Sequence, residues 1–119
     1  MEFRVVMKRA KHIANSQGTL AASPAEIGED GTLTLCAASC IARAAIELYG
    51  DSNHVREFEA RVVSEDKLEY LPALFRQLGL SEHLARATLA ENDSRPESSR
   101  LDWFNALPQM RGRQNEPIQ

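Results

Sequence analysis

The chain has 119 residues, with 14 lysines and arginines against 17 aspartates and glutamates, and a formal net charge of −3 at pH 7. This length fits one domain around a single hydrophobic core. The acidic balance excludes binding of nucleic acid or anionic membranes through net charge alone. Only two cysteines are present, which excludes a disulfide-stapled secreted domain. Charges interrupt the first apolar residues, so we expect no signal peptide and a cytoplasmic protein without membrane association.

Residues 2–15 predict an amphipathic helix, because apolar side chains recur there at helical spacing. Its opposite face carries the most basic patch of the chain. We interpret this patch as a solvent-exposed face, with phosphate binding as the alternative. The patch consists of Arg4, Lys8, Arg9, Lys11 and His12.

The segment between residues 17 and 31 is rich in glycine and ends in Glu29-Asp30-Gly31, which predicts turns. We expect an irregular connection here. The alternative is a small β-hairpin in which residues 19–22 pair with residues 32–35.

The only long, nearly uniform apolar run spans residues 33–50. Its polar members Ser39, Arg43 and Glu47 recur every four residues, which places them on one narrow stripe of a helix. A helix that is apolar on its other faces is typical of a domain core, so we predict a central helix over residues 34–49. Its many alanines allow close packing within the fold or against a second copy, which leaves a homodimer open.

Cys36 and Cys40 lie one helical turn apart in this run. In the first turn, the helix dipole would favour a thiolate at Cys36, as a thiol-dependent enzyme or a redox sensor requires. The alternative is that both cysteines fill the core as small apolar residues. A structural zinc site takes about four ligands, and two cysteines do not supply them. We therefore predict no metal and no cofactor.

Four further helices are expected in the second half of the chain, each with a capping residue before its apolar positions. Pro72 implies a late start or a kink in the second of them. Asn92-Asp93 is interpreted as a turn, with Asn92 as a left-handed cap. Beyond residue 110 we expect a flexible tail. The predicted helices cover residues 51–64, 66–78, 81–91 and 99–107.

The stretch around Gly79 resembles the turn of a helix-turn-helix motif. The helix after it would present three acidic residues against the single Arg86, and acidic side chains repel phosphate. DNA binding is therefore an alternative function, and nucleic acid is not the expected partner.

Several motifs follow one another in a recognisable order: an Asp30-Gly31 turn, a helix opening Cys36-Ala37-Ala38-Ser39-Cys40-Ile41, and the later Asn92-Asp93 pair. This order resembles an uncharacterised family of small helical bacterial proteins. The sequence departs from that pattern at Ser39-Cys40, where Gly-Ala is common, and at Glu91, where Trp is usual. The resemblance implies a fold type and a candidate surface, and it carries no activity.

Together these patterns predict an all-α orthogonal bundle of five or six helices around the central helix, within a single domain over residues 1–110. The expected function is a non-enzymatic protein-interaction or regulatory module whose protein or small-molecule partner is open. The candidate surface combines the Cys36 end of the central helix with Arg43, Asn92, Asp93 and Arg100.

Overall fold

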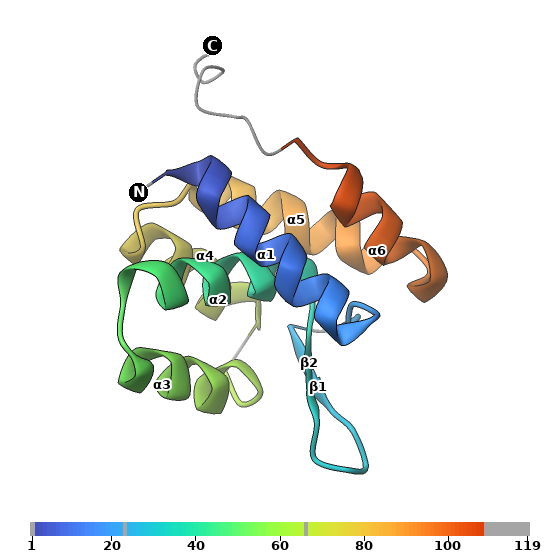
Figure 1. Ribbon diagram of the computed structural model, residues 1–119, viewed down its shortest axis with the longest axis horizontal. Coiled ribbons are helices and arrows are strands. Elements are labelled where there is room, and N and C mark those ends of the chain that lie inside the picture. Colours follow the sequence, from blue (N-terminus) through green and yellow to red (C-terminus); the bar gives the residue numbers. More distant parts are fainter. Residues whose placement is uncertain (1, 23, 66, 109–119) are drawn as a thin grey trace.

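The computed structural model describes residues 2–22, 24–65 and 67–108. This part of the chain forms six helices and one short antiparallel hairpin (Figure 1). The predicted class, an all-α bundle with a small β-hairpin, is confirmed. The tail predicted over residues 111–119 lies outside the described residues. The elements in chain order are α1 (Phe3–Gln17), β1 (Ala25–Ile27), β2 (Leu33–Leu35), α2 (Ala37–Tyr49), α3 (Ser52–Val62), α4 (Lys67–Gln77), α5 (Glu82–Ser94) and α6 (Glu97–Ala106).

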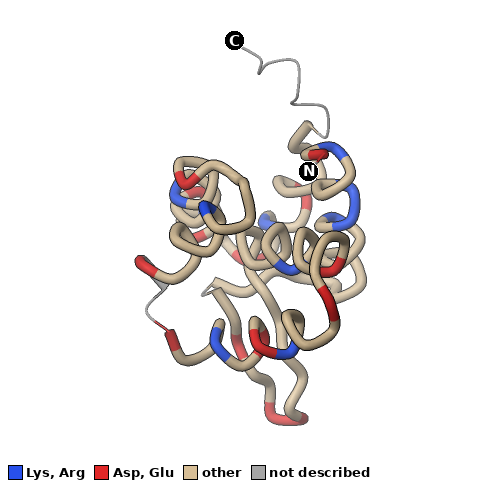
Figure 2. Tube along the Cα trace, turned by 90° about the vertical axis from the view of Figure 1, so that its left-hand side faces the viewer, with Lys and Arg blue, Asp and Glu red and all other residues tan. Residues whose placement is uncertain are grey.

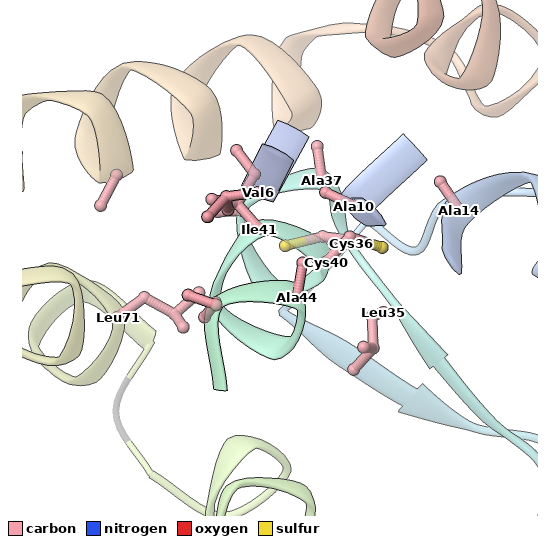
Figure 3. Packing of buried hydrophobic residues seen from close by; sticks show 14 of the residues in the cluster. Val6, Ala10, Ala14, Leu35, Cys36, Ala37, Cys40, Ile41, Ala44 and Leu71 are labelled. Carbon is pink, nitrogen blue, oxygen red and sulfur yellow. The ribbon is translucent and has the colours of Figure 1, made fainter. Parts of the chain in front are cut away.

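The central helix α2 buries nine of its 13 side chains, as the apolar run predicts for a core helix. Figure 3 shows Val6 and Ala10 of α1 beside Ala37 and Ile41 of α2. Small side chains on both helices let the two backbones approach closely. The alanines of α2 are thus buried within the chain, so they are not available for contact with a second copy.

The start of the central helix was predicted wrongly. Residues 33–35 form β2, and Cys36 is the extended N-cap residue of a helix that begins at Ala37. The hairpin partner of β2 is β1, with Ala25 opposite Leu35 and Ile27 opposite Leu33, so residues 19–22 are not the first arm. The turn suits this pairing because Gly31 adopts a left-handed φ of 82°, which glycine tolerates best.

The hairpin projects from the helical body and carries acidic residues at its tip (Figures 1 and 2). At the other end of α2, α3 begins after a connection of two residues. Asp51 caps α3 by accepting a hydrogen bond from the backbone of His54 at 2.9 Å. Pro72 lies buried inside α4, which begins at Lys67, so the predicted helix over residues 66–78 is confirmed and the alternative of a later start is wrong. The predicted cap residue Asp66 lies outside the described residues.

Candidate functional site

Both cysteines lie in the core. Cys36 and Cys40 expose none of their surface, and Figure 3 shows their sulfur atoms inside the apolar cluster. Burial raises the pKa of Cys36 and raises that of Cys40 well above its usual value. The Cys36 thiol donates to the hydroxyl oxygen of buried Ser39 at 3.6 Å. Burial and a raised pKa oppose the thiolate that a reactive cysteine needs.

Asn92 is not a turn residue, and the prediction of a left-handed cap is wrong. It lies inside α5, which continues to Ser94, and its side chain is 1% exposed. The amide oxygen accepts from the backbone N–H of Ala37 at 3.1 Å, and the amide nitrogen donates to the carbonyl of Ala21 at 2.8 Å. Asn92 thereby caps the N-terminus of α2 from another helix, where Cys36 makes no side-chain cap.

Arg100 of α6 lies against the same part of the fold. Its guanidinium donates to the carbonyl oxygens of Asn92 and Arg95, both at 3.1 Å, and to that of Leu20 at 3.3 Å. The structure therefore brings two predicted site residues together, Asn92 and Arg100, as a network that joins α5, α6 and the segment after α1. Asp93 is exposed and points away from this network's buried amide, since neighbouring residues face different sides of a helix.

Arg43 lies elsewhere, between three helices. Its Nε atom lies 2.8 Å from a carboxylate oxygen of Glu47, and its other end donates to Glu59 of α3. Glu47 also accepts from Arg9 of α1 at 2.7 Å. The polar stripe of α2 thus holds α1, α2 and α3 together, and Arg43 is not part of a surface with Asn92.

The basic face of α1 is not a uniform solvent-exposed patch. Lys11 is only 9% exposed, and its ammonium group donates to the carbonyl oxygens of Asn105 and Leu107 at the end of α6. Burial lowers the pKa of Lys11. The amine acts as a C-terminal cap for α6, where free carbonyls and the helix dipole favour a cation.

The turn at Gly79 joins α4 and α5, the two helices of the suspected helix-turn-helix. Ala85 and Thr88 of α5 are buried in the core. On the exposed side Arg86 pairs with Glu82 at 2.8 Å, which neutralises the cation that would meet a phosphate.

A cleft that the sequence analysis did not predict lies between the C-terminal part of α2 and helices α3 and α4. Its volume is about 640 Å³. This size falls within the range of about 300–1,000 Å³ that is common for binding sites. Its apolar lining comes from all three helices and includes Ile46, Phe58, Tyr70, Ala73, Leu74 and Leu78.

Two tyrosines give the cleft aromatic surface. Tyr70 of α4 stacks on Phe58 of α3, with ring centres 6.5 Å apart. Tyr49 ends α2, lines the cleft and is 52% exposed, and its hydroxyl oxygen accepts from the backbone of Glu2 at 3.3 Å. Aromatic side chains with one apolar and one polar end are enriched at protein interfaces. Tyr49 therefore presents this kind of aromatic surface at the edge of the cleft.

The rim of the cleft is acidic around one cation. Arg61 of α3 lies over the ring of Tyr70 at 5.2 Å and between Glu57 and Glu65, at 3.7 and 3.6 Å. Glu69 adds a third carboxylate. Figure 2, which views the side where α3 and α4 lie, shows acidic and basic residues interspersed along α3. Among the described residues that line the cleft, three carboxylates stand against one guanidinium, which leaves this part of the rim negative.

The electrostatics of the rim act on Tyr70. Burial raises the pKa of its hydroxyl, Arg61 lowers it, and the carboxylates of Glu57 and Glu65 raise it again. The phenol therefore stays protonated and offers a hydrogen-bond donor. The cleft therefore combines an apolar floor with a rim that suits a positively charged group.

Sequence reasoning missed this cleft because its apolar residues, such as Phe58, Leu74 and Leu78, were assigned to the buried faces of their helices. The one available signal was the pair of tyrosines, Tyr49 and Tyr70, next to charged residues on predicted helix faces.

No family model, no curated protein and no solved structure matches the chain.

Within residues 2–22, 24–65 and 67–108, no helix is both long and apolar enough to cross a bilayer. Nor do three His, Cys, Asp or Glu residues of the same ranges come together as metal ligands.

Proposed function

We propose that this protein is a non-enzymatic interaction domain whose cleft between α2, α3 and α4 binds a segment of a partner protein. The observation that carries the proposal is the open cleft of about 640 Å³ with an apolar floor and a half-exposed Tyr49 at its rim. Interfaces are dominated by a few aromatic and apolar anchors that fill such hollows. A groove walled by helices suits an amphipathic helix laid along it.

The alternative functions have less support. A thiol enzyme or redox sensor needs an accessible thiolate, and Cys36 is buried with a raised pKa. DNA binding needs a basic recognition face, and α5 carries Arg86 already paired with Glu82. The resemblance to a family of uncharacterised bacterial proteins stays a prediction and adds no activity. Two cysteines without a disulfide support a reducing compartment, so we place the protein in the cytoplasm.

The test is a selection of displayed peptides from the proteome of the source organism against the native protein. Ala73→Trp fills the cleft with a neutral ring, and Ala90→Trp adds the same ring on the exposed face of α5 as a matched control. We expect peptides that bind the native protein and Ala90→Trp but not Ala73→Trp. Peptides that bind all three proteins equally, or no enrichment at all, would overturn the proposal. Enrichment of a small metabolite instead of peptides, seen by mass spectrometry of the native protein, would also overturn it.

A further inference from the structure

We infer that the partner segment is cationic, and that Arg61 occupies the place which a lysine or arginine of the partner takes on binding. This inference rests on the proposed function and specifies its partner. The observation behind it is the position of Arg61, which lies 5.2 Å above the Tyr70 ring and between two glutamates.

The surroundings of Arg61 form a cation site built from two chemistries. An aromatic face attracts a cation that lies within about 6 Å of its centre. Carboxylates of Glu57 and Glu65 flank the same position at 3.7 and 3.6 Å. These distances are long for charge-assisted hydrogen bonds, which are about 2.7–2.9 Å. Arg61 thus occupies the site without making its best contacts.

The side chain of Arg61 can leave this position at little cost. Its side chain is 48% exposed, and both of its ion pairs are with residues four positions away in the chain, Glu57 within α3 and Glu65 just after that helix. Exposed pairs of this kind contribute little because solvent screens them and holding two long side chains costs entropy. A partner cation can therefore replace the guanidinium at the Tyr70 face.

Charge complementarity indicates the sign of the partner segment's charge. With Arg61 in place, the carboxylates of Glu57, Glu65 and Glu69 still outnumber the one guanidinium among the described residues that line the cleft. A neutral or acidic helix would leave these carboxylates uncompensated at the interface, whereas a basic one pairs with them. The apolar floor with Phe58 and Leu74 requires that the partner also has an apolar stripe. The occupant that satisfies both conditions is a basic amphipathic helix.

Three synthetic helices test the inference. Each has about 15 residues, or roughly four turns, and the same leucine stripe, and the polar positions are all Lys, all Glu or all Gln. Fluorescence anisotropy of the labelled peptides measures the Kd for the folded full chain. We expect the Lys peptide to bind most tightly. Its binding should be lost in the Ala73→Trp variant and kept in the Ala90→Trp variant.

Charge variants of the protein then decide the role of Arg61. Arg61→Gln removes the competing guanidinium and should tighten binding of the Lys peptide roughly two- to fivefold, as expected for one exposed charge. Glu69→Gln should weaken it by a similar factor. Arg86→Gln and Glu29→Gln make the same changes away from the cleft and should leave Kd unchanged. Thermal unfolding of each variant checks that the fold is retained.

The outcomes separate this inference from the proposed function. If the Glu or Gln peptide binds best and its binding is lost in Ala73→Trp, the cleft is an interaction site but the inference of a cationic partner is wrong. If Arg61→Gln weakens binding of the Lys peptide, Arg61 contacts the peptide, and the inference that a partner cation replaces Arg61 is wrong. If the Lys peptide binds the Ala73→Trp variant as tightly as the native protein, the binding is non-specific charge attraction, and the inference is overturned. If no peptide shows binding that depends on the cleft, both proposals fail.

Discussion

Asn92 provides the sharpest test of how this fold is held together. Its amide bridges the N–H of Ala37 at 3.1 Å and the carbonyl of Ala21 at 2.8 Å, with 1% of its surface exposed. Asn92→Ala leaves both backbone groups buried without a partner. An unsatisfied buried polar group costs about 1–3 kcal/mol, so the two together cost about 2–6 kcal/mol, and we expect about 3–4 kcal/mol.

Urea denaturation followed by circular dichroism measures this loss. With an m value of about 2 kcal/mol/M, the midpoint should fall by roughly 1.5–2 M. Asn92→Leu fills the space without restoring the hydrogen bonds, so its loss should equal that of Asn92→Ala if the hydrogen bonds dominate. Asn105→Ala is the matched control, because Asn105 makes amide hydrogen bonds to Asn15 that are exposed to solvent. Exposed substitutions of this kind usually change stability by less than about 0.5 kcal/mol.

The reasoning would be refuted by a loss below about 1 kcal/mol in Asn92→Ala, the net value of an ordinary hydrogen bond. It would also be refuted if Asn92→Leu were as stable as the native protein, since the cost would then come from a cavity rather than from unpaired polar groups. Either result would return Asn92 to the candidate surface that its sequence context suggested.

Two further outcomes follow from the buried polar groups. Because burial raises the pKa of both thiols, Cys36 and Cys40 should resist maleimide in the native protein at pH 8 and react only on unfolding. The free energy of unfolding should also fall above about pH 9, because there only the unfolded chain releases the two thiol protons. Rapid labelling of native Cys36, with Cys36→Ser as the control, would contradict this. Lys11→Met removes the cation that caps α6 and should cost about 1–2 kcal/mol in urea unfolding, whereas Lys8→Met on the exposed face of α1 should cost almost nothing. Equal losses in the two lysine variants would mean that the cap contributes no stability.

Helical periodicity predicted most of the architecture because the core helices depend on local patterns. The apolar spacing of α1 and the alanine-rich run of α2 both identify faces that are buried in the structure. Strand β2 was read as helix because three residues are too short to show an alternating period, and the apolar run continues through them. The pairing of β2 with β1 depends on a loop closure that periodicity does not encode.

The errors at Asn92 and Lys11 have a common physical cause. Asparagine favours helix ends because its amide competes for nearby backbone groups, which is why a turn was predicted there. In the fold that amide is satisfied by Ala21 and Ala37, 71 and 55 positions away in the chain. Lysine favours solvent, yet Lys11 lies under the end of α6. Such partners are set by tertiary packing, which outweighs local propensity.

The same contrast separates structural polar groups from those available to a ligand. The partners of Asn92 and Arg100 include atoms 55 to 80 positions away in the chain, and these contacts use the polar atoms that a ligand would need. On the cleft wall, the ion pairs of Arg61 with Glu57 and Glu65 lie within its own stretch of chain, and its side chain stays half exposed. Long-range hydrogen bonds make the Asn92 network part of the scaffold, because breaking them exposes unpaired backbone in the core. Short-range surface pairs can exchange partners at little cost. We therefore propose that recognition uses the α3–α4 side of the fold, where polar groups are held loosely over an apolar floor, and not the residues whose types stand out most in the sequence.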